Sequence, residues 1–187
     1  MKRTHLAPVL AALLLVLPAA SQAKSRPPGY LAVKGGGYFP QHGDLEGFDG
    51  GLLLEVAYGR HVTPGFAVEG SVGYFRSESD SLLPAGADEV SALPVLLTVK
   101  GVAPFGTVEG YGLAGAGVYF VETKGPLGGS DDDTVVGFHL GAGGNVFLSE
   151  GFFLGAELKY LFLEANRLGQ DLRLDGFAFT ANAGFRF

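Results

Sequence analysis

The sequence predicts an all-β protein, an eight-stranded antiparallel up-and-down transmembrane β-barrel. Eight stretches of alternating apolar residues are each long enough to cross a bilayer as a tilted strand, which takes roughly 9–11 residues. The connections between them alternate between tight turns and long segments, as in membrane barrels. Charged residues within the stretches keep mostly to one of the two strand faces.

The eight predicted strands follow one another without any helical segment between them. Glycine, with 31 residues, interrupts almost every stretch, and the apolar period is two rather than 3.6, so helices are disfavoured. The predicted strands are Tyr30–Phe39, Gly51–His61, Phe66–Phe75, Leu93–Val102, Val108–Val121, Val135–Phe147, Phe152–Leu163 and Leu174–Phe187.

The connections divide the predicted barrel into two different ends. Tight turns are expected at residues 62–65, 103–107 and 149–151, and long connections at residues 40–50, 76–92, 122–134 and 164–173. Outer-membrane barrels place short turns on the periplasmic side and long loops outside. Both termini of the predicted barrel fall on the side of the tight turns.

Side-chain parity predicts which face of each strand meets lipid. In the last strand, Phe177, Phe179 and Phe185 share one face, and Thr180 and Arg186 share the other. A Lys or Arg that points into lipid at the midplane costs roughly 2–4 kcal/mol, so mid-strand charges must face the lumen. The predicted lumenal charges are Lys34, Glu55, Glu69, Lys100, Glu109, Glu157, Lys159 and Arg186.

These eight predicted lumenal charges balance, four positive against four negative. An eight-stranded barrel has an interior just wide enough to be filled by side chains. Enclosed charges must then be paired and hydrogen-bonded, or they destabilise the fold. We therefore hypothesise a lumenal ion-pair network that plugs the barrel.

The first 23 residues read as a secretory signal peptide that is cleaved. Lys2 and Arg3 precede an apolar core, and Ser21-Gln22-Ala23 provides small residues for a signal peptidase, which leaves a barrel domain of residues 24–187. The chain has no Cys, so neither a lipid-anchoring cysteine nor a disulfide is available. Without Lys2 and Arg3 the formal charge is −8, which argues against nucleic-acid binding.

Several motifs have a structural and a functional interpretation. Residues 110–115 match the dinucleotide pattern GxGxxG, but an alternating strand rather than a helix follows, so no cofactor is predicted. Residues 130–133, with three Asp, could bind calcium but lack EF-hand spacing, and a solvated acidic loop is favoured. His139 faces the lumen beside Ser71, but no catalytic or metal site is predicted.

Outward aromatic residues near strand ends are predicted to form interfacial girdles: Phe39, Tyr58, Phe66, Phe152, Phe185 and Phe187.

Several stretches resemble the outer-membrane β-barrel family that includes the OmpA transmembrane domain, the OmpX and Ail group and the opacity proteins. They are Leu93–Lys100, Tyr111–Gly117, Gly137–Gly143, Gly155–Tyr160 and Gly184–Phe187. The resemblance implies a bacterial outer-membrane protein surrounded by the lipid bilayer and lipopolysaccharide. It also implies that the assembly machinery recognises Phe185 and Phe187 in the last strand.

The resemblance leaves three functions open. The first is a non-enzymatic structural or surface-interaction role through the four long external loops, with an unknown ligand at these loops. The alternative is a narrow channel, or a transporter that opens laterally between strands for small or hydrophobic molecules, with the glycine-rich fifth strand as the expected position. Enzymatic modification of lipid is the least favoured.

Overall fold

The computed structural model describes residues 29–40, 51–63, 65–78, 89–124, 130–167, 170–173 and 175–187. The described residues are almost all in strands. The strands are β1 (Gly29–Pro40), β2 (Gly51–Thr63), β3 (Phe66–Glu78), β4 (Glu89–Phe105), β5 (Val108–Lys124), β6 (Ser130–Phe147), β7 (Phe152–Arg167), β8 (Gln170–Arg173) and β9 (Gly176–Arg186).

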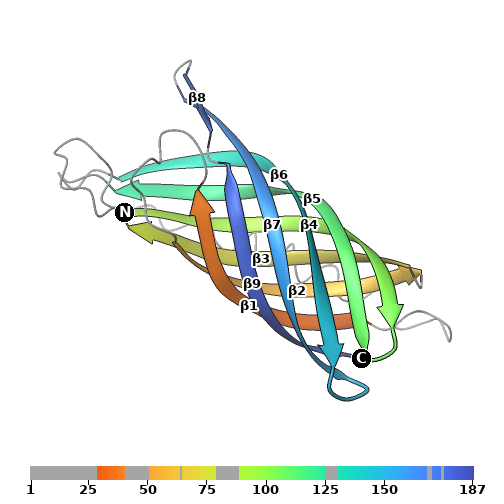
Figure 1. The fold of residues 1–187 in the computed structure, drawn as a ribbon. Coiled ribbons are helices and arrows are strands. Elements are labelled where there is room, and N and C mark those ends of the chain that lie inside the picture. Colours follow the sequence, from red (N-terminus) through yellow and green to blue (C-terminus); the bar gives the residue numbers. More distant parts are fainter. Residues whose placement is uncertain are drawn as a thin grey trace.

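Eight of these strands close into the predicted barrel. Each strand from β1 to β7 pairs with the next in antiparallel register, and β9 pairs with both β7 and β1 (Figure 1). The short strand β8 pairs only with the end of β7 and stands outside the closed wall. The up-and-down order confirms the predicted fold class. No helix among the described residues is long and apolar enough to cross a membrane.

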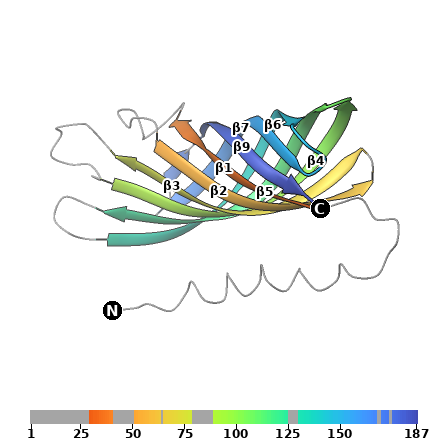
Figure 2. The ribbon, with the colours of Figure 1, turned by 90° about the horizontal axis from the view of Figure 1, so that it is seen from below.

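The two ends of the barrel differ as predicted. The end with the three tight turns, which also holds Gly29 and Phe187, is called the turn end below, and the opposite end is called the loop end. The predicted signal peptide lies outside the described residues, as do residues 41–50, 79–88 and 125–129 of the long connections. The strands that form the wall are tilted as they run from one end of the barrel to the other (Figure 2).

Two of the segments predicted to be long connections are strands over much of their length, and the prediction is wrong there. Most of 122–134 belongs to β5 and β6, which pair as far as Lys124 with Ser130, so the three Asp residues lie in a strand. Most of 164–173 is a hairpin of β7 with β8. Strand β3 also runs on to Glu78, and β4 begins at Glu89. Main-chain ladders need no apolar side chains, so strands continue past the point where apolar alternation, the signal used for the prediction, ends.

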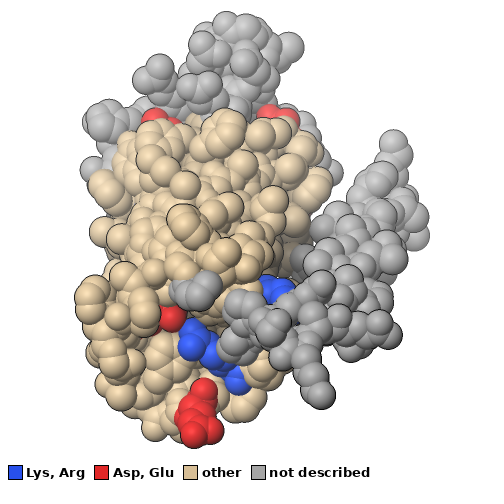
Figure 3. Space-filling view, turned by 90° about the vertical axis from the view of Figure 1, so that its right-hand side faces the viewer, with Lys and Arg blue, Asp and Glu red and all other residues tan. Residues whose placement is uncertain are grey.

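The outer wall is apolar between the two ends, and the parity prediction is confirmed. Leu52, Leu97 and Phe138 are each about 60% exposed, as large side chains that face lipid would be. Figure 3 shows a broad expanse of uncharged residues, with charged side chains at its top and in the lower part of the view. The described charged side chains outside the lumen lie near strand ends or in a turn: Arg60, Arg76, Glu122, Asp133, Glu150 and Asp175.

The predicted aromatic girdles consist of residues that do point outward. Phe39, Phe66 and Phe185 are each more than half exposed, and Phe187 stacks beside Tyr58 at the turn end. Aromatic rings at these positions would meet the interfacial layers of a bilayer.

The interior contains two apolar clusters that the parity argument did not predict. The turn-end cluster is made of buried Tyr30, Ala32, Ala67 and Phe153. The loop-end cluster is larger and consists of Tyr38, Leu53, Leu96, Tyr119, Val135, Leu161, Leu163 and Ala178. Along the same strands, the inward positions near mid-strand carry the charged side chains. The polar part of the lumen is therefore a middle layer between two apolar layers.

Replacing Gly36 with alanine is expected to destabilise the barrel at the β1–β9 seam. A Cβ atom at Gly36 would overlap the carbonyl oxygen of Phe179, which belongs to the main chain of β9 and cannot move aside cheaply. We expect a loss of about 1–3 kcal/mol in the free energy of unfolding, measured by urea titration in lipid vesicles. The control is Gly112→Ala, where nothing lies within 4 Å of the new methyl group. Equal stability of the two variants would contradict the predicted close approach.

Candidate functional site

The centre of the lumen is occupied by the ammonium group of Lys34, on β1. Its Nζ lies 2.9 Å from Glu55 Oε1, 2.7 Å from Glu69 Oε1 and 3.1 Å from Glu157 Oε1. These three carboxylates come from β2, β3 and β7, and all four side chains are at most 2% exposed. One cation therefore joins four strands of the wall.

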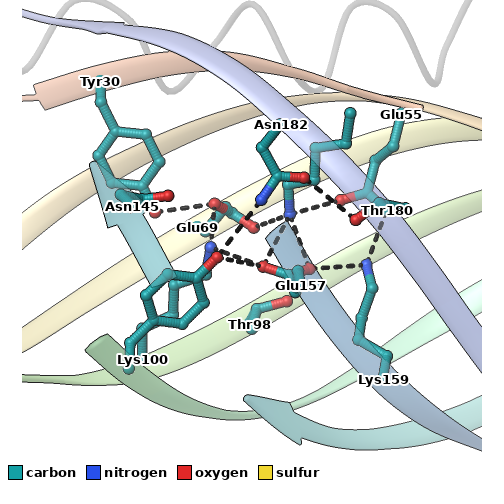
Figure 4. A network of polar contacts seen from close by, with 12 residues as sticks. Tyr30, Glu55, Glu69, Thr98, Lys100, Asn145, Glu157, Lys159, Thr180 and Asn182 are labelled. Atoms are coloured by element: carbon teal, nitrogen blue, oxygen red, sulfur yellow. Dashed lines mark hydrogen bonds and ion pairs between the residues drawn. The ribbon is translucent and has the colours of Figure 1, made fainter. Parts of the chain in front are cut away.

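Two further lysines share the same three carboxylates. Lys100 Nζ lies 2.7 Å from Glu69 Oε2 and 3.2 Å from Glu157 Oε2. Lys159 Nζ lies 2.8 Å from Glu55 Oε2 and 3.2 Å from Glu157 Oε1. Figure 4 shows Lys100 and Lys159 on opposite sides of Glu157. The six groups form one closed network, called the central network below, in which each carboxylate contacts at least two lysines.

Neutral side chains complete the hydrogen bonding of the central network. Tyr30 Oη donates to Glu69 over 2.8 Å, and Tyr111 Oη donates to Glu157 over 3.1 Å. Asn182 Nδ2 lies 3.4 Å from the Tyr111 hydroxyl, and Thr180 Oγ1 donates to the side-chain oxygen Oδ1 of Asn182 over 3.1 Å. Lys100 also lies over the ring of Tyr111, 4.5 Å from its centroid.

The remaining predicted pair lies apart, at the turn end. Arg186 Nη2 is 2.9 Å from Glu109 Oε2, and Asn145 Nδ2 lies 3.4 Å from the other oxygen of Glu109. The Arg186 guanidinium stacks over Phe147 at 4.4 Å. The Arg186 side chain is 25% exposed, so this pair is nearer to solvent than the central network. It borders a pocket at the turn end that is lined by Tyr30, His61, Lys100 and Phe153 among others.

All eight predicted charges thus lie in the lumen, six in one group and two in another. No role in the lumen is predicted from the sequence for Tyr30 or Tyr111. A signal was nevertheless present, because Tyr111 follows Glu109 by two residues and Tyr30 precedes Lys34 by four. An even spacing along a strand places two side chains on the same face.

The central network carries no net charge, since three ammonium groups face three carboxylates. Charges removed from water lose several kcal/mol of solvation each, and mutual attraction offsets that loss only when geometry and hydrogen bonding are good. Here each partner is fixed by a strand of the closed wall. The arrangement can hold the wall together and fill the lumen, and each charge already has its partners.

The alternative motifs do not assemble a reactive site in the described part of the chain. His139 Nε2 lies 2.9 Å from Thr98 Oγ1, whereas Ser71, the suggested neighbour, has a buried Oγ with no hydrogen-bond partner. The GxGxxG stretch lies in the first half of β5, paired on both sides. Among the described residues, no group of three or more His, Cys, Asp and Glu could hold a metal ion.

The comparison with protein families decides the assignment. Residues 9–187 match the family described as outer membrane protein β-barrel domain. The chain belongs to this family. The apolar outer wall and the lumenal polar layer are what a member needs in a bilayer, because a charge that faces lipid has no partner, whereas a lumenal charge can be paired. No curated protein sequence matches the chain significantly.

Solved structures of outer-membrane proteins share the fold. Neisserial surface protein A superposes with a TM-score of 0.67 at 13% identity, covering 85% of this chain and 97% of that one. OprG from Pseudomonas aeruginosa gives 0.62 at 14% identity, covering 89% and 99%. Ail, the attachment invasion locus protein of Yersinia pestis, gives 0.55 at 16% identity, covering 87% and 100%. At such identities the likeness establishes the fold.

Proposed function

We propose that this chain is a non-enzymatic protein of the bacterial outer membrane that acts through contacts made at its loop end. In this proposal, residues 1–23 are removed on export, and Phe185 and Phe187 in and beside β9 are read by the assembly machinery. The turn end then faces the periplasm and the loop end faces outward, as short turns and long loops do in this class. The observation that carries the proposal is the filled lumen.

The filled lumen argues against a water-filled axial channel. An ion that entered from the loop end would first have to cross the loop-end cluster and lose its water there. It would then meet the central network, whose six charged groups are each no more than 5% exposed and already paired. Below these lie the rings of the turn-end cluster. The three layers together act as the plug.

The segments predicted from the sequence to be long connections are the most acidic part of the chain. The segments 40–50, 76–92, 122–134 and 164–173 contain 13 acidic residues and four basic ones. A surface of this sign fits cationic partners, and we propose that divalent cations link it to lipopolysaccharide phosphates. We expect magnesium to raise the unfolding temperature in lipopolysaccharide-containing bilayers and a chelator to lower it. An unfolding temperature that does not respond to either would count against this contact.

Conductance in planar bilayers tests the plug. The purified, folded protein is expected to insert without producing a steady open pore, because no described lumenal layer offers a continuous wet path. A large general porin added to the same bilayer serves as the control for insertion. Heat-modifiable migration on gels shows that the sample is folded. A large, steady open-channel current from folded protein would overturn the proposal.

A further inference from the structure

The turn end of the barrel contains a pocket, called the turn-end pocket below, that reaches inward as far as the central network. It has about 290 Å³ of space, part of which is open to solvent. Each of the eight strands of the closed wall contributes at least one residue to its lining, and Lys100 of the central network is one of them. The pocket is therefore a bowl in the lumen, on the side of the plug opposite to the loop end.

The charged groups that line the turn-end pocket are mostly cationic. Lys100 and Arg186 line it, and Glu109 is the carboxylate among its lining residues. Glu109 already contacts Arg186 Nη2 at 2.9 Å and Asn145 Nδ2 at 3.4 Å, and His61 Nε2 lies 3.9 Å from it. An anion that enters the pocket would meet more positive than negative charge at contact distance.

Two N–H groups of these cations have no acceptor within the described part of the chain. The Arg186 Nε atom is buried and makes no hydrogen bond. The Lys100 ammonium has three N–H groups and donates two hydrogen bonds, to Glu69 Oε2 over 2.7 Å and to Glu157 Oε2 over 3.2 Å. A buried donor without an acceptor destabilises a fold, and a charged donor does so more strongly. Both cations thus have a spare donor for a ligand.

The two spare donors come from opposite sides of the pocket. Lys100 is on β4 and Arg186 is on β9, and these strands are four apart in a ring of eight. A group with two acceptor oxygens can take both bonds, and a negative charge makes both bonds stronger. Beside them, the rings of Phe147 and Phe153 pack together with centroids 5.6 Å apart. The chemistry that fits is a carboxylate with an apolar neighbour.

We propose that the turn-end pocket binds a carboxylate, which accepts hydrogen bonds from Arg186 Nε and Lys100 Nζ. The carboxylate belongs either to a small free anion or to the end of a larger molecule whose apolar part lies against Phe147 and Phe153. Binding goes beyond the function proposed above and leaves the plug closed. In the orientation proposed there, the ligand comes from the periplasm, but binding itself does not depend on that orientation.

Nuclear magnetic resonance of the folded protein in uncharged detergent micelles tests the proposal. The signal of the Arg186 Nε–H group is followed while sodium acetate or N-acetyl-phenylalanine is added at constant ionic strength. The amide of N-acetyl-phenylalanine, which lacks the carboxylate, is the control ligand. The variant Arg186→Lys keeps a cation beside Glu109 but removes the Nε–H group, so it assigns the signal. In this variant the main-chain amide signals of β5 and β6 report binding.

We expect both carboxylates to shift the Arg186 signal in a saturable manner, and the amide to leave it in place. Arg186→Lys should weaken binding about tenfold, because one charge-assisted hydrogen bond is lost. The matched control Arg60→Lys makes the same change on the outer face near the turn end and should bind as the wild type does. Tighter binding of N-acetyl-phenylalanine than of acetate would support a larger ligand, and equal binding would support a small anion.

Three results would overturn the inference, provided that heat-modifiable migration on gels shows folded protein. They are the absence of a saturable shift with either carboxylate, an equal shift with the amide, and unchanged affinity in Arg186→Lys. Each of these results concerns the turn-end pocket alone. The conductance test of the plug and the test of the loop-end contacts are unaffected by them.

Discussion

Replacing Lys34 with methionine is expected to be the most damaging single substitution in the barrel. The Lys34 ammonium lies within 3.1 Å of Glu55, Glu69 and Glu157, and its loss leaves three buried carboxylates with only two lysines. Removing one partner of a buried ionic group typically costs about 3–5 kcal/mol, because the remaining charge stays in a poorly solvated place. We expect a loss of that size in the free energy of unfolding, measured by denaturant titration in lipid vesicles.

A second substitution separates charge from packing in this experiment. The double variant Lys34→Met/Glu157→Gln removes one charge of each sign and leaves two close pairs, Lys100 with Glu69 at 2.7 Å and Lys159 with Glu55 at 2.8 Å. We expect the double variant to regain most of the lost stability. If it is no more stable than Lys34→Met alone, volume rather than charge balance governs the site. Wild-type stability in Lys34→Met itself would refute the central role of Lys34.

The location of the lumenal charges could be predicted because lipid imposes a strict rule on strand parity. Once Glu157 and Lys159 are placed on one face of β7, the opposite face must meet acyl chains, and no other information is needed. The grouping of the charges could not be predicted in this way. Whether Arg186 joins the central network or pairs with Glu109 depends on the stagger between strands, which a single strand does not encode.

The apolar layers of the lumen were missed for a related reason. Lipid excludes charges from outward positions, but it places no limit on apolar residues at inward positions. The lumenal position of Leu53 and Leu161 therefore cannot be deduced from their residue type. A narrow barrel has little room for water, and its interior is packed like the core of a soluble protein wherever charges are not required. The alternation that predicts the strands therefore underestimates how much of the lumen is a hydrophobic core.

The ends of β5, β6 and β7 could not be predicted because these strands extend beyond their apolar segments. Beyond Val121 the pairing of β5 with β6 continues through Glu122 and Thr123, residues that look like loop in the sequence. These longer strands have a consequence for function, since part of the loop end is made of paired strands. Contacts proposed for this end would be made in part by paired strands, which lose less conformational entropy on binding.

A lysine at Leu97 provides the other large expected effect and tests the membrane orientation on which the functional proposals rest. Leu97 is the middle residue of β4 and is 61% exposed on the outer face. In a water-soluble barrel, an exposed Leu→Lys change would be close to neutral, usually within about 0.5 kcal/mol. In a bilayer, the same lysine would stand near the midplane and should cost about 2–4 kcal/mol of unfolding free energy.

The matched control for this measurement is Val62→Lys, which is 57% exposed but lies at the turn end beside the interfacial layer. There the cost should be about 0–1 kcal/mol, because the ammonium group can reach the headgroups. The difference between the two variants, measured by denaturant titration in phospholipid vesicles, reports depth in the membrane rather than loss of an apolar side chain. Equal costs at both positions would place Leu97 in water and would remove the physical basis for charges held inside the barrel.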